Sequence, residues 1–352
     1  MATIKHYFPG GNTSKGFVNY FDGIIAPWVE NRRIYVLKGG PGVGKNTFMK
    51  LFSKCALEKE YDLEYFHCAS DVNSLDAVHI PKLGVTMLDG TAPHVIDPVT
   101  PGAIDGIINL GVYLNEAGLE KRRTEIREFM IDNSRCYKST FAYLTAAGEL
   151  QENSNYLYLA ALDAAELRKE VQNLMSSYTV KSAKMTGAVR KLFLEAYTPQ
   201  GYMNYMDTIQ ETRKIALMGP ECIATEFIQM ALSFASFMGY ECQVFYSALL
   251  PQNPIHMIIE DLGLCLTTGA TELWDYEKVI DLSSLLNQKL LHKYNDTVVF
   301  NDLYKGQLLE AAVGSLRRAK EIHDEIELIY RDNMDFEKAT IYTEKFVKEF
   351  GF

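Results

Sequence analysis

The sequence predicts an α/β fold in which two tandem parallel-sheet cores are each followed by a helical arm. Short apolar runs alternate with amphipathic segments, and most of this alternation occurs twice along the chain. Strands that alternate with helices favour a parallel sheet covered by helices on both faces. At 352 residues, the chain is long enough to form two such cores, each with its own apolar interior.

The duplication is visible as identities at a constant spacing. Residues 13–22 match residues 198–207 at their threonine, glycine, asparagine, tyrosine and aspartate positions. The spacing then shortens, and Gly40-Pro41 matches Gly219-Pro220. Repetition of this extent predicts the same structural unit twice. Further identical pairs are Phe48 and Phe227, Tyr61 and Tyr240, Phe66 and Phe245, and Gly90 and Gly269.

Each unit is expected to contain four strands, helices after the first and second strands, and then an arm. The amphipathic spacing of the arms favours packing between them over a surface for a protein partner. The expected strands are 4–8, 34–37, 63–68 and 84–88, and 189–193, 215–218, 242–246 and 263–266. The helices after the first strands are expected at 16–25 and 201–209. The expected units are 1–188, with core 1–114 and arm 115–188, and 189–352, with core 189–290 and arm 291–352.

The most specific motif lies between the second strand of the first unit and the helix that follows it. It reads Gly39-Gly40-Pro41-Gly42-Val43-Gly44-Lys45-Asn46-Thr47. A strand, a glycine-rich turn, a lysine and a helix are the layout of a phosphate-binding P-loop. Backbone N–H groups of the turn surround an anion, the helix dipole favours it, and Lys45 reaches the β- and γ-phosphates. The predicted nucleotide-binding residues are Gly40, Pro41, Gly42, Val43, Gly44, Lys45, Asn46 and Thr47.

Asn46 departs from this motif. A serine or threonine normally follows the lysine, because its hydroxyl binds Mg²⁺. Thr47 comes one residue later and points about 100° further round the helix. The carbonyl oxygen of an asparagine can also bind a hard cation. Asn46 and Thr47 are therefore both candidate Mg²⁺ ligands, and efficient turnover is in doubt.

Further candidate site residues follow the third and fourth strands of the first unit. Asp89 closes the apolar run Val85–Leu88, the place of a carboxylate that holds Mg²⁺. Asp71 follows the third strand and is a second metal candidate. His94 lies in the loop after Asp89 and is a candidate general base. Structural alternatives are a turn at Asp89-Gly90, a helix N-cap at Asp71 and a solvated loop histidine at His94.

The second unit lacks the groups that this chemistry requires. Ala224 stands at the position of Lys45, and Glu221 and Glu226 stand where Gly42 and Thr47 occur in the first unit. Two carboxylates without a lysine repel phosphate. The second unit is therefore expected to be degenerate, with Lys45, Asp89 and His94 as the only candidate catalytic residues.

Composition excludes several classes of partner. The net charge of −10 argues against binding to nucleic acid or to an anionic membrane surface. The sequence contains no run of about 18 apolar residues and no apolar signal segment near Met1. Its six cysteines are not spaced as C-x-x-C pairs, which predicts reduced thiols and a cytoplasmic location.

The motif at 39–47 resembles that of the P-loop NTPase superfamily, and the wider pattern resembles a bacterial family of duplicated P-loop ATPases. This resemblance covers most of the chain and implies an ATP-binding fold without a defined substrate. In that family pattern Ser or Thr follows the lysine, so Asn46 is a departure. The segments that carry the resemblance are 11–17, 39–47, 76–81, 88–94 and 101–103.

Three functions fit these features. The first is a weak ATPase or nucleotide-dependent switch that uses ATP and Mg²⁺ at one site and moves its arms. The second is a P-loop kinase for a small molecule, with Asp71 orienting the acceptor and residues 121–123 as candidate lid cations. The third is a non-enzymatic scaffold with a residual nucleotide pocket, which Asn46 and the degenerate second unit favour.

Overall fold

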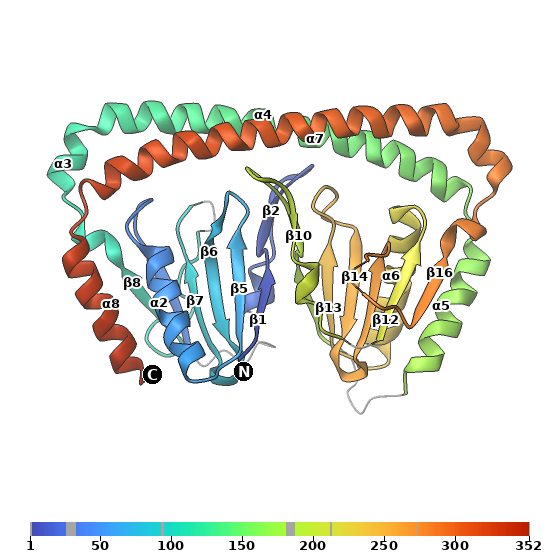
Figure 1. Cartoon of the computed structure of the whole chain (residues 1–352), viewed down its shortest axis with the longest axis horizontal. Helices are drawn as coiled ribbons and strands as arrows, with labels where there is room; N and C mark the ends of the chain where they lie inside the picture. Colours follow the sequence, from blue (N-terminus) through green and yellow to red (C-terminus); the bar gives the residue numbers. More distant parts are fainter. Residues whose placement is uncertain are drawn as a thin grey trace.

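The chain has an α/β fold in which two β-sheets lie side by side beneath a pair of long helices (Figure 1). The structure is a computed structural model, and it describes residues 2–25, 33–92, 95–180, 187–211, 213–272 and 274–351. Each half of the chain contributes one six-stranded sheet. A smaller four-stranded sheet joins the two halves at the centre.

The first sheet has the strand order β1-β5-β6-β7-β4-β8. Strand β1 runs parallel to β5, and β4 runs parallel to both β7 and β8. Strand β6 runs antiparallel to its neighbours β5 and β7. The strands are β1 (Ile4–Tyr7), β4 (Arg33–Lys38), β5 (Leu63–Cys68), β6 (Asp71–Ile80), β7 (Val85–Asp89) and β8 (Asp105–Asn109).

The second sheet repeats this order as β9-β13-β14-β15-β12-β16, so the two halves share one topology, as the internal repeat predicts. Strand β14 is again antiparallel to both of its neighbours. The strands are β9 (Val189–Leu192), β12 (Arg213–Met218), β13 (Cys242–Tyr246), β14 (Pro254–Ile259), β15 (Leu264–Thr268) and β16 (Lys278–Asp281).

The expectation of wholly parallel sheets is wrong at β6 and β14. Only two residues separate β5 from β6, so the chain turns back as a hairpin. A parallel neighbour would need a crossover of a dozen or more residues. The connector expected between the third and fourth strands is thus itself a strand, placed between β5 and β7.

The helices expected at 16–25 and 201–209 are also wrong. The first four residues of each segment are instead strands β3 (Gly16–Asn19) and β11 (Gly201–Asn204), which form hairpins with β2 (Gly10–Thr13) and β10 (Glu195–Thr198). Gly16 and Gly201 have φ angles of 91° and 112°, which a tight turn tolerates and a helix does not. Only the short helix α1 (Asp22–Ile25) and the 3₁₀ turn η3 (Met206–Thr208) remain.

The four hairpin strands pair across the two halves in the order β11-β10-β2-β3. Long helices follow each sheet, as expected for the arms. One 3₁₀ turn follows each of β6, β8, β14 and β16. The helices are α2 (Lys45–Glu58), α3 (Glu116–Lys121), α4 (Arg123–Ala160), α5 (Ala164–Tyr178), α6 (Glu221–Phe237), α7 (Gln288–Arg331) and α8 (Phe336–Phe350). The turns are η1 (Pro81–Leu83), η2 (Leu110–Tyr113), η4 (Glu260–Leu262) and η5 (Leu282–Leu285).

The arms exchange partners between the halves (Figure 1). Helix α4 leaves the first half and crosses to the second, where α5 packs its buried leucines against α6. Helix α7 runs in the opposite direction, and α8 packs against α2 of the first half. Phe346 of α8 contacts the rings of Tyr35, Phe48 and Phe52. Each core is therefore completed by a helix that follows the other core in sequence.

The two long helices pack against each other along the top of the molecule. Their central residues Leu144, Ala147, Ala312 and Leu316 are buried against the loop at 248–250. Within the ranges that the structure describes, no helix has the length and apolarity needed to cross a membrane, although α7 has 44 residues. Some apolar residues of the pair pack against the cores, and others, such as Phe300 and Leu328, are exposed.

A buried ion pair links the two sheets below the hairpins. The guanidinium of Arg190 donates to both carboxylate oxygens of Glu64, at 2.8 and 2.7 Å, and to the Gly23 carbonyl at 2.6 Å. The Arg190 and Glu64 side chains are only 12% and 8% exposed. Burial alone would raise the pKa of Glu64, but the charge and hydrogen bonds of Arg190 outweigh it and lower that pKa.

Replacing Arg190 by methionine should destabilise the protein by about 3–5 kcal/mol at pH 7, because it leaves a buried carboxylate without its partner. The folded-state pKa of Glu64 lies below its ordinary value of 4.5, so the pair stabilises the fold above that pH. The stability difference between wild type and Arg190→Met should narrow as the pH falls through the folded-state pKa. Urea denaturation at several pH values measures both effects.

The matched control is Lys169→Met, which breaks the exposed pair between Lys169 and Glu166. An exposed pair contributes at most about 1 kcal/mol. If the two variants lose the same stability, the Arg190–Glu64 pair does not hold the halves together.

Candidate functional site

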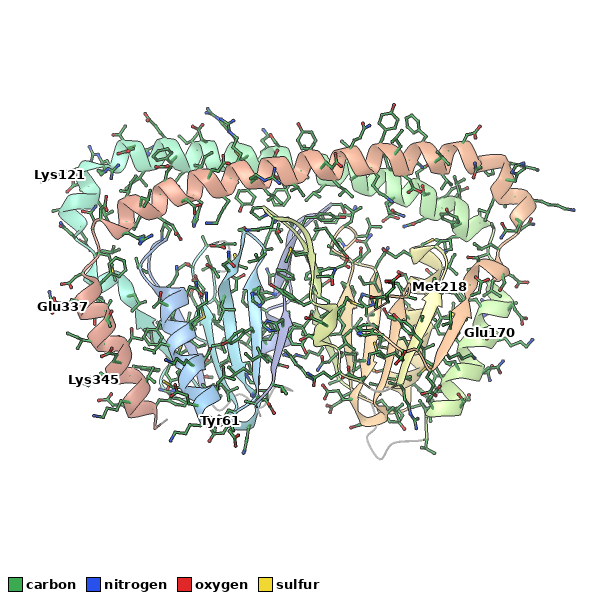
Figure 2. The ribbon with its side chains drawn as sticks, viewed as in Figure 1. Tyr61, Lys121, Glu170, Met218, Glu337 and Lys345 are labelled. Atoms are coloured by element: carbon green, nitrogen blue, oxygen red, sulfur yellow. The ribbon has the colours of Figure 1, made fainter. Side chains whose placement is uncertain are left out.

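The glycine loop, residues Gly39–Gly44, connects the carboxyl end of β4 to the first residue of α2. Figure 2 places Tyr61, which precedes β5, at the end of the first core that faces away from the long helices. The carboxyl ends of the parallel strands therefore face α4 and α7. The carboxyl edge of an α/β sheet is where such folds place ligands.

The backbone of the glycine loop takes conformations that other residues rarely adopt. Gly42 and Gly44 have φ angles of 67° and 94°. Helix α2 begins directly after Gly44, has no side-chain cap and carries no acidic residue in its first turn. The N–H groups of a first helical turn have no partner within the helix. The loop and helix start therefore offer backbone donors and a positive dipole end to an anion.

Lys45 lies at the centre of this arrangement and is only 11% exposed. Its ammonium donates to the carbonyls of Gly39 and Gly40 at 2.9 and 3.3 Å and to the Thr91 hydroxyl at 2.8 Å. The side chain thus folds back over the loop that precedes it. The ammonium is thus held beside the backbone N–H groups of the loop and the helix start.

Asp89 lies beside Lys45, as its position after an apolar strand predicts. It is the last residue of β7, and its Oδ2 lies 3.2 Å from the Lys45 ammonium. Its Oδ1 accepts from the backbone N–H and the hydroxyl of Thr91 at 2.9 and 2.5 Å. Asp89 therefore forms the turn at Asp89-Gly90 and also contacts Lys45. Its interpretation as a turn residue does not exclude its interpretation as a carboxylate of the site.

Asn46 ties α2 to strand β6. Its Oδ1 accepts the backbone N–H of Leu75 at 3.2 Å, and its amide nitrogen donates to Asn73 O and Ser74 Oγ at 3.5 and 3.4 Å. The oxygen that would bind a cation is thus engaged with backbone in this conformation. Thr47 is exposed on α2, on a different face from Lys45.

Asp71 is placed at the start of β6 and not at a helix start, so the helix N-cap alternative is wrong. Its carboxylate accepts from Asn73 N and Ser74 Oγ, which follow it in β6, at 3.2 and 3.1 Å. It also lies 3.4 Å from the ammonium of Lys320 on α7. Asp71 therefore connects the first core to the arm of the second half.

The loop after Asp89 is organised by Lys38, the last residue of β4. The Lys38 ammonium donates to the carbonyls of Gly90 and Ile96, both at 2.8 Å, and to Asp97 at 2.9 Å. His94 lies outside the described residues, so its place relative to Lys45 is not defined. Across the described residues, no three histidine, cysteine, aspartate or glutamate side chains gather as a metal site.

The last turn of α7 also contacts the glycine loop, which sequence reasoning missed. A Cβ on Gly40 would lie 2.5 Å from Cε1 of Tyr330, and one on Gly42 would lie 3.0 Å from Cγ of Arg331. The carbonyl of Glu327 lies equally close to that position on Gly42. These contacts join residues almost 300 positions apart, so local sequence carries no direct sign of them. The repeated tyrosine in the two arms is the one available clue.

The corresponding place in the second half is built differently. Helix α6 begins at Glu221, immediately after Gly219 and Pro220, so no loop like Gly39–Gly44 forms. Ala224, at the Lys45 position, is fully buried in the core. A cavity of about 730 Å³ nearby is lined by Glu195 and Glu221, and burial raises the pKa of Glu195 to about 7. Lys305 and Arg317 line the same cavity, so the charges around it are mixed.

Comparisons with known proteins provide no external reference for this site. No protein-family model matches the chain, and neither a curated protein nor a solved structure matches it. The interpretation therefore depends on the geometry around Lys45 and on the difference between the two halves of one chain.

Proposed function

We propose that this chain binds ATP at the glycine loop of its first half and acts as a weak ATPase or nucleotide-dependent switch. The observation that supports this most strongly is the position of Lys45. Its nearly buried ammonium lies within 3.3 Å of Gly39 O, Thr91 Oγ1 and Asp89 Oδ2, next to an uncapped helix start. Backbone donors with a fixed cation are the chemistry that polyphosphate recognition requires.

The residues fit the groups that such a function implies. The N–H groups of residues 42–45 and the Lys45 ammonium would hold the phosphates, and Mg²⁺ would neutralise their charge when bound. Asp89 suits this metal better than Asn46, whose oxygen already accepts from Leu75, or Thr47, which is exposed. The Asp89 carboxylate is already paired with Lys45 and hydrogen-bonded by Thr91, so it is less available to a metal and we expect slow turnover.

The contact between Lys320 and Asp71 bears on the kinase alternative. An acceptor-orienting carboxylate must be open to a substrate hydroxyl, whereas Asp71 is paired with Lys320 and accepts a hydrogen bond from Ser74 of its own strand. Arg122, one of the candidate lid cations, is held by both carboxylate oxygens of Glu125. The arrangement therefore favours an ATPase or switch whose arms respond to nucleotide, with a protein partner of the arms as a further proposal.

Lys45→Ala should abolish ATP binding, because it removes the ammonium that lies against the carbonyls of the glycine loop. Isothermal titration calorimetry should find one site per wild-type chain and none in the variant. Lys54→Ala, an exposed lysine of the same helix, is the matched control and should bind as wild type does. Two sites per wild-type chain, or unchanged binding by Lys45→Ala, would contradict the assignment.

Asp89→Asn should weaken ATP binding more in the presence of Mg²⁺ than in its absence. The amide keeps the shape of the side chain but loses the charge that a hard cation prefers. The measurement is the ratio of the dissociation constants with Mg²⁺ and with EDTA. An equal change under both conditions would limit Asp89 to positioning Thr91 and Lys45.

Asn46→Ser should raise steady-state ATP hydrolysis, because a hydroxyl suits the short, near-octahedral coordination of Mg²⁺. Asn46→Ala is the control, since it also loses the bond to Leu75 but supplies no hydroxyl. Release of ADP measures the rate. If serine and alanine have the same effect, the tie between α2 and β6, and not metal binding, determines the role of Asn46.

A further inference from the structure

The last turn of α7 forms one side of the site around Lys45, although this helix belongs to the second half of the chain. Tyr330 packs its ring against Gly40, and the stem of Arg331 lies against Gly42. The absence of side chains on both glycines permits this approach. The Arg331 side chain is exposed, and its charge also acts on the Glu327 carboxylate one turn earlier, whose pKa it helps to lower.

The two arms can be compared position by position, because the sequence repeat aligns α7 with α4. The tyrosine is kept in both arms, and Tyr158 packs against the second core. At two other aligned positions, a cation occurs only in α7, whose last turn covers the glycine loop. The aligned pairs are Tyr330 with Tyr158, Arg331 with Leu159, and Lys320 with Gly148.

This loss of charge coincides with the loss of Lys45. Ala224 replaces the lysine in the second half, and Leu159 replaces the arginine of the arm above it. A structural role common to both halves would preserve both positions, as it preserves the tyrosines. The two cations are present together and absent together, as expected of residues that serve one polyanion.

The helix dipole offers a simpler reason for a cation at this place. A basic residue in the last turn offsets the partial negative charge of a helix C-terminus. Helix α4 ends in the equivalent place over the second core, and its last turn contains no basic residue. The dipole is therefore tolerated there without compensation, and it does not account for Arg331.

A chain of polar contacts also anchors α7 to the start of α2. Lys320 pairs with Asp71, Asp71 accepts from Ser74, and Ser74 lies 3.4 Å from the amide nitrogen of Asn46. Partial burial would lower the pKa of Lys320, but Asp324 and Asp71 outweigh it and raise that pKa. The arm is thus fixed beside the residue that follows Lys45, which restricts where Arg331 can reach.

We propose that Arg331 binds the terminal phosphate at the Lys45 site, so that the site is composed of the loop of one half and the arm of the other. This inference depends on the nucleotide function proposed above and adds a residue and a mode of coupling to it. A guanidinium matches the geometry of phosphate oxygens and pairs with two of them at once. ADP lacks the terminal phosphate, so Arg331 makes the arm sensitive to the difference between ATP and ADP.

The test compares Arg331→Ala with Arg318→Ala. Arg318 is an exposed arginine of the same helix, so both variants lose the same charge. Calorimetry with ATP and with ADP, each with Mg²⁺, gives four affinities to set beside those of wild type. Arg331→Ala should weaken ATP binding about tenfold, the effect of one lost charge-assisted hydrogen bond. ADP binding should change much less, and Arg331→Lys should recover part of the ATP affinity.

Thermal unfolding without nucleotide separates binding from folding. Equal melting temperatures for Arg331→Ala and Arg318→Ala show that the lost affinity is local to the site. If both variants weaken ATP binding equally, or if Arg331→Ala weakens ATP and ADP alike, the inference about Arg331 is overturned. If wild type binds no ATP, or if Lys45→Ala binds as wild type does, the proposed function itself has failed.

Discussion

The antiparallel packing of α4 against α7 is the constraint on which the rest of this structure depends. A rise of about 1.5 Å per residue makes α7 about 66 Å long, enough to cross both sheets. Long polar helices gain most of their stability from the stripe they bury against neighbours, here the contact between the arms and the loop at 248–250. Because the helices cross, each core receives its last covering helix from the other half. Backbone bonds at both corners, such as Asn115 N to Asn333 O and Asn287 N to Ala161 O, fix the crossing.

This exchange turns a duplicated chain into one cooperative unit. The Arg190–Glu64 pair and the four-stranded central sheet join the cores from below, while the arms join them from above. Neither core is complete without residues from the other half, since α8 covers α2 and α5 covers α6. A change at the glycine loop therefore has a direct physical route to α7, through the packing of Tyr330 on Gly40. Coupling between the glycine loop and the second half requires an element that contacts both of them, and α7 is that element.

The two halves share a topology but differ in the chemistry at the ends of their strands. In the first half, a loop of glycines separates β4 from α2, and Lys45 follows it directly. In the second half, α6 starts at once after Pro220, and Glu221 stands in the first turn. Duplicated sites often allow one copy to keep the chemistry while the other keeps the architecture. The cavity lined by Glu195, Glu221, Lys305 and Arg317 fits the architectural role, because it belongs to the contact surface between hairpin, core and arms.

The sequence by itself determined the α/β class, the duplication, eight of the sixteen strands in the described residues, and the proximity of Asp89 to Lys45. These features depend on local patterns: apolar runs, glycines at fixed spacing, and the rule that parallel strands end at one edge. It did not determine the hairpins at residues 10–19 and 195–204, because their strands are short and polar and show no apolar alternation. These strands pair within each hairpin and meet across the two halves through β2 and β10. Nor did it determine that Asn46 binds β6 or that Arg331 lies at the glycine loop. Those contacts depend on where distant segments meet, and only the crossing of the arms in the tertiary structure decided that.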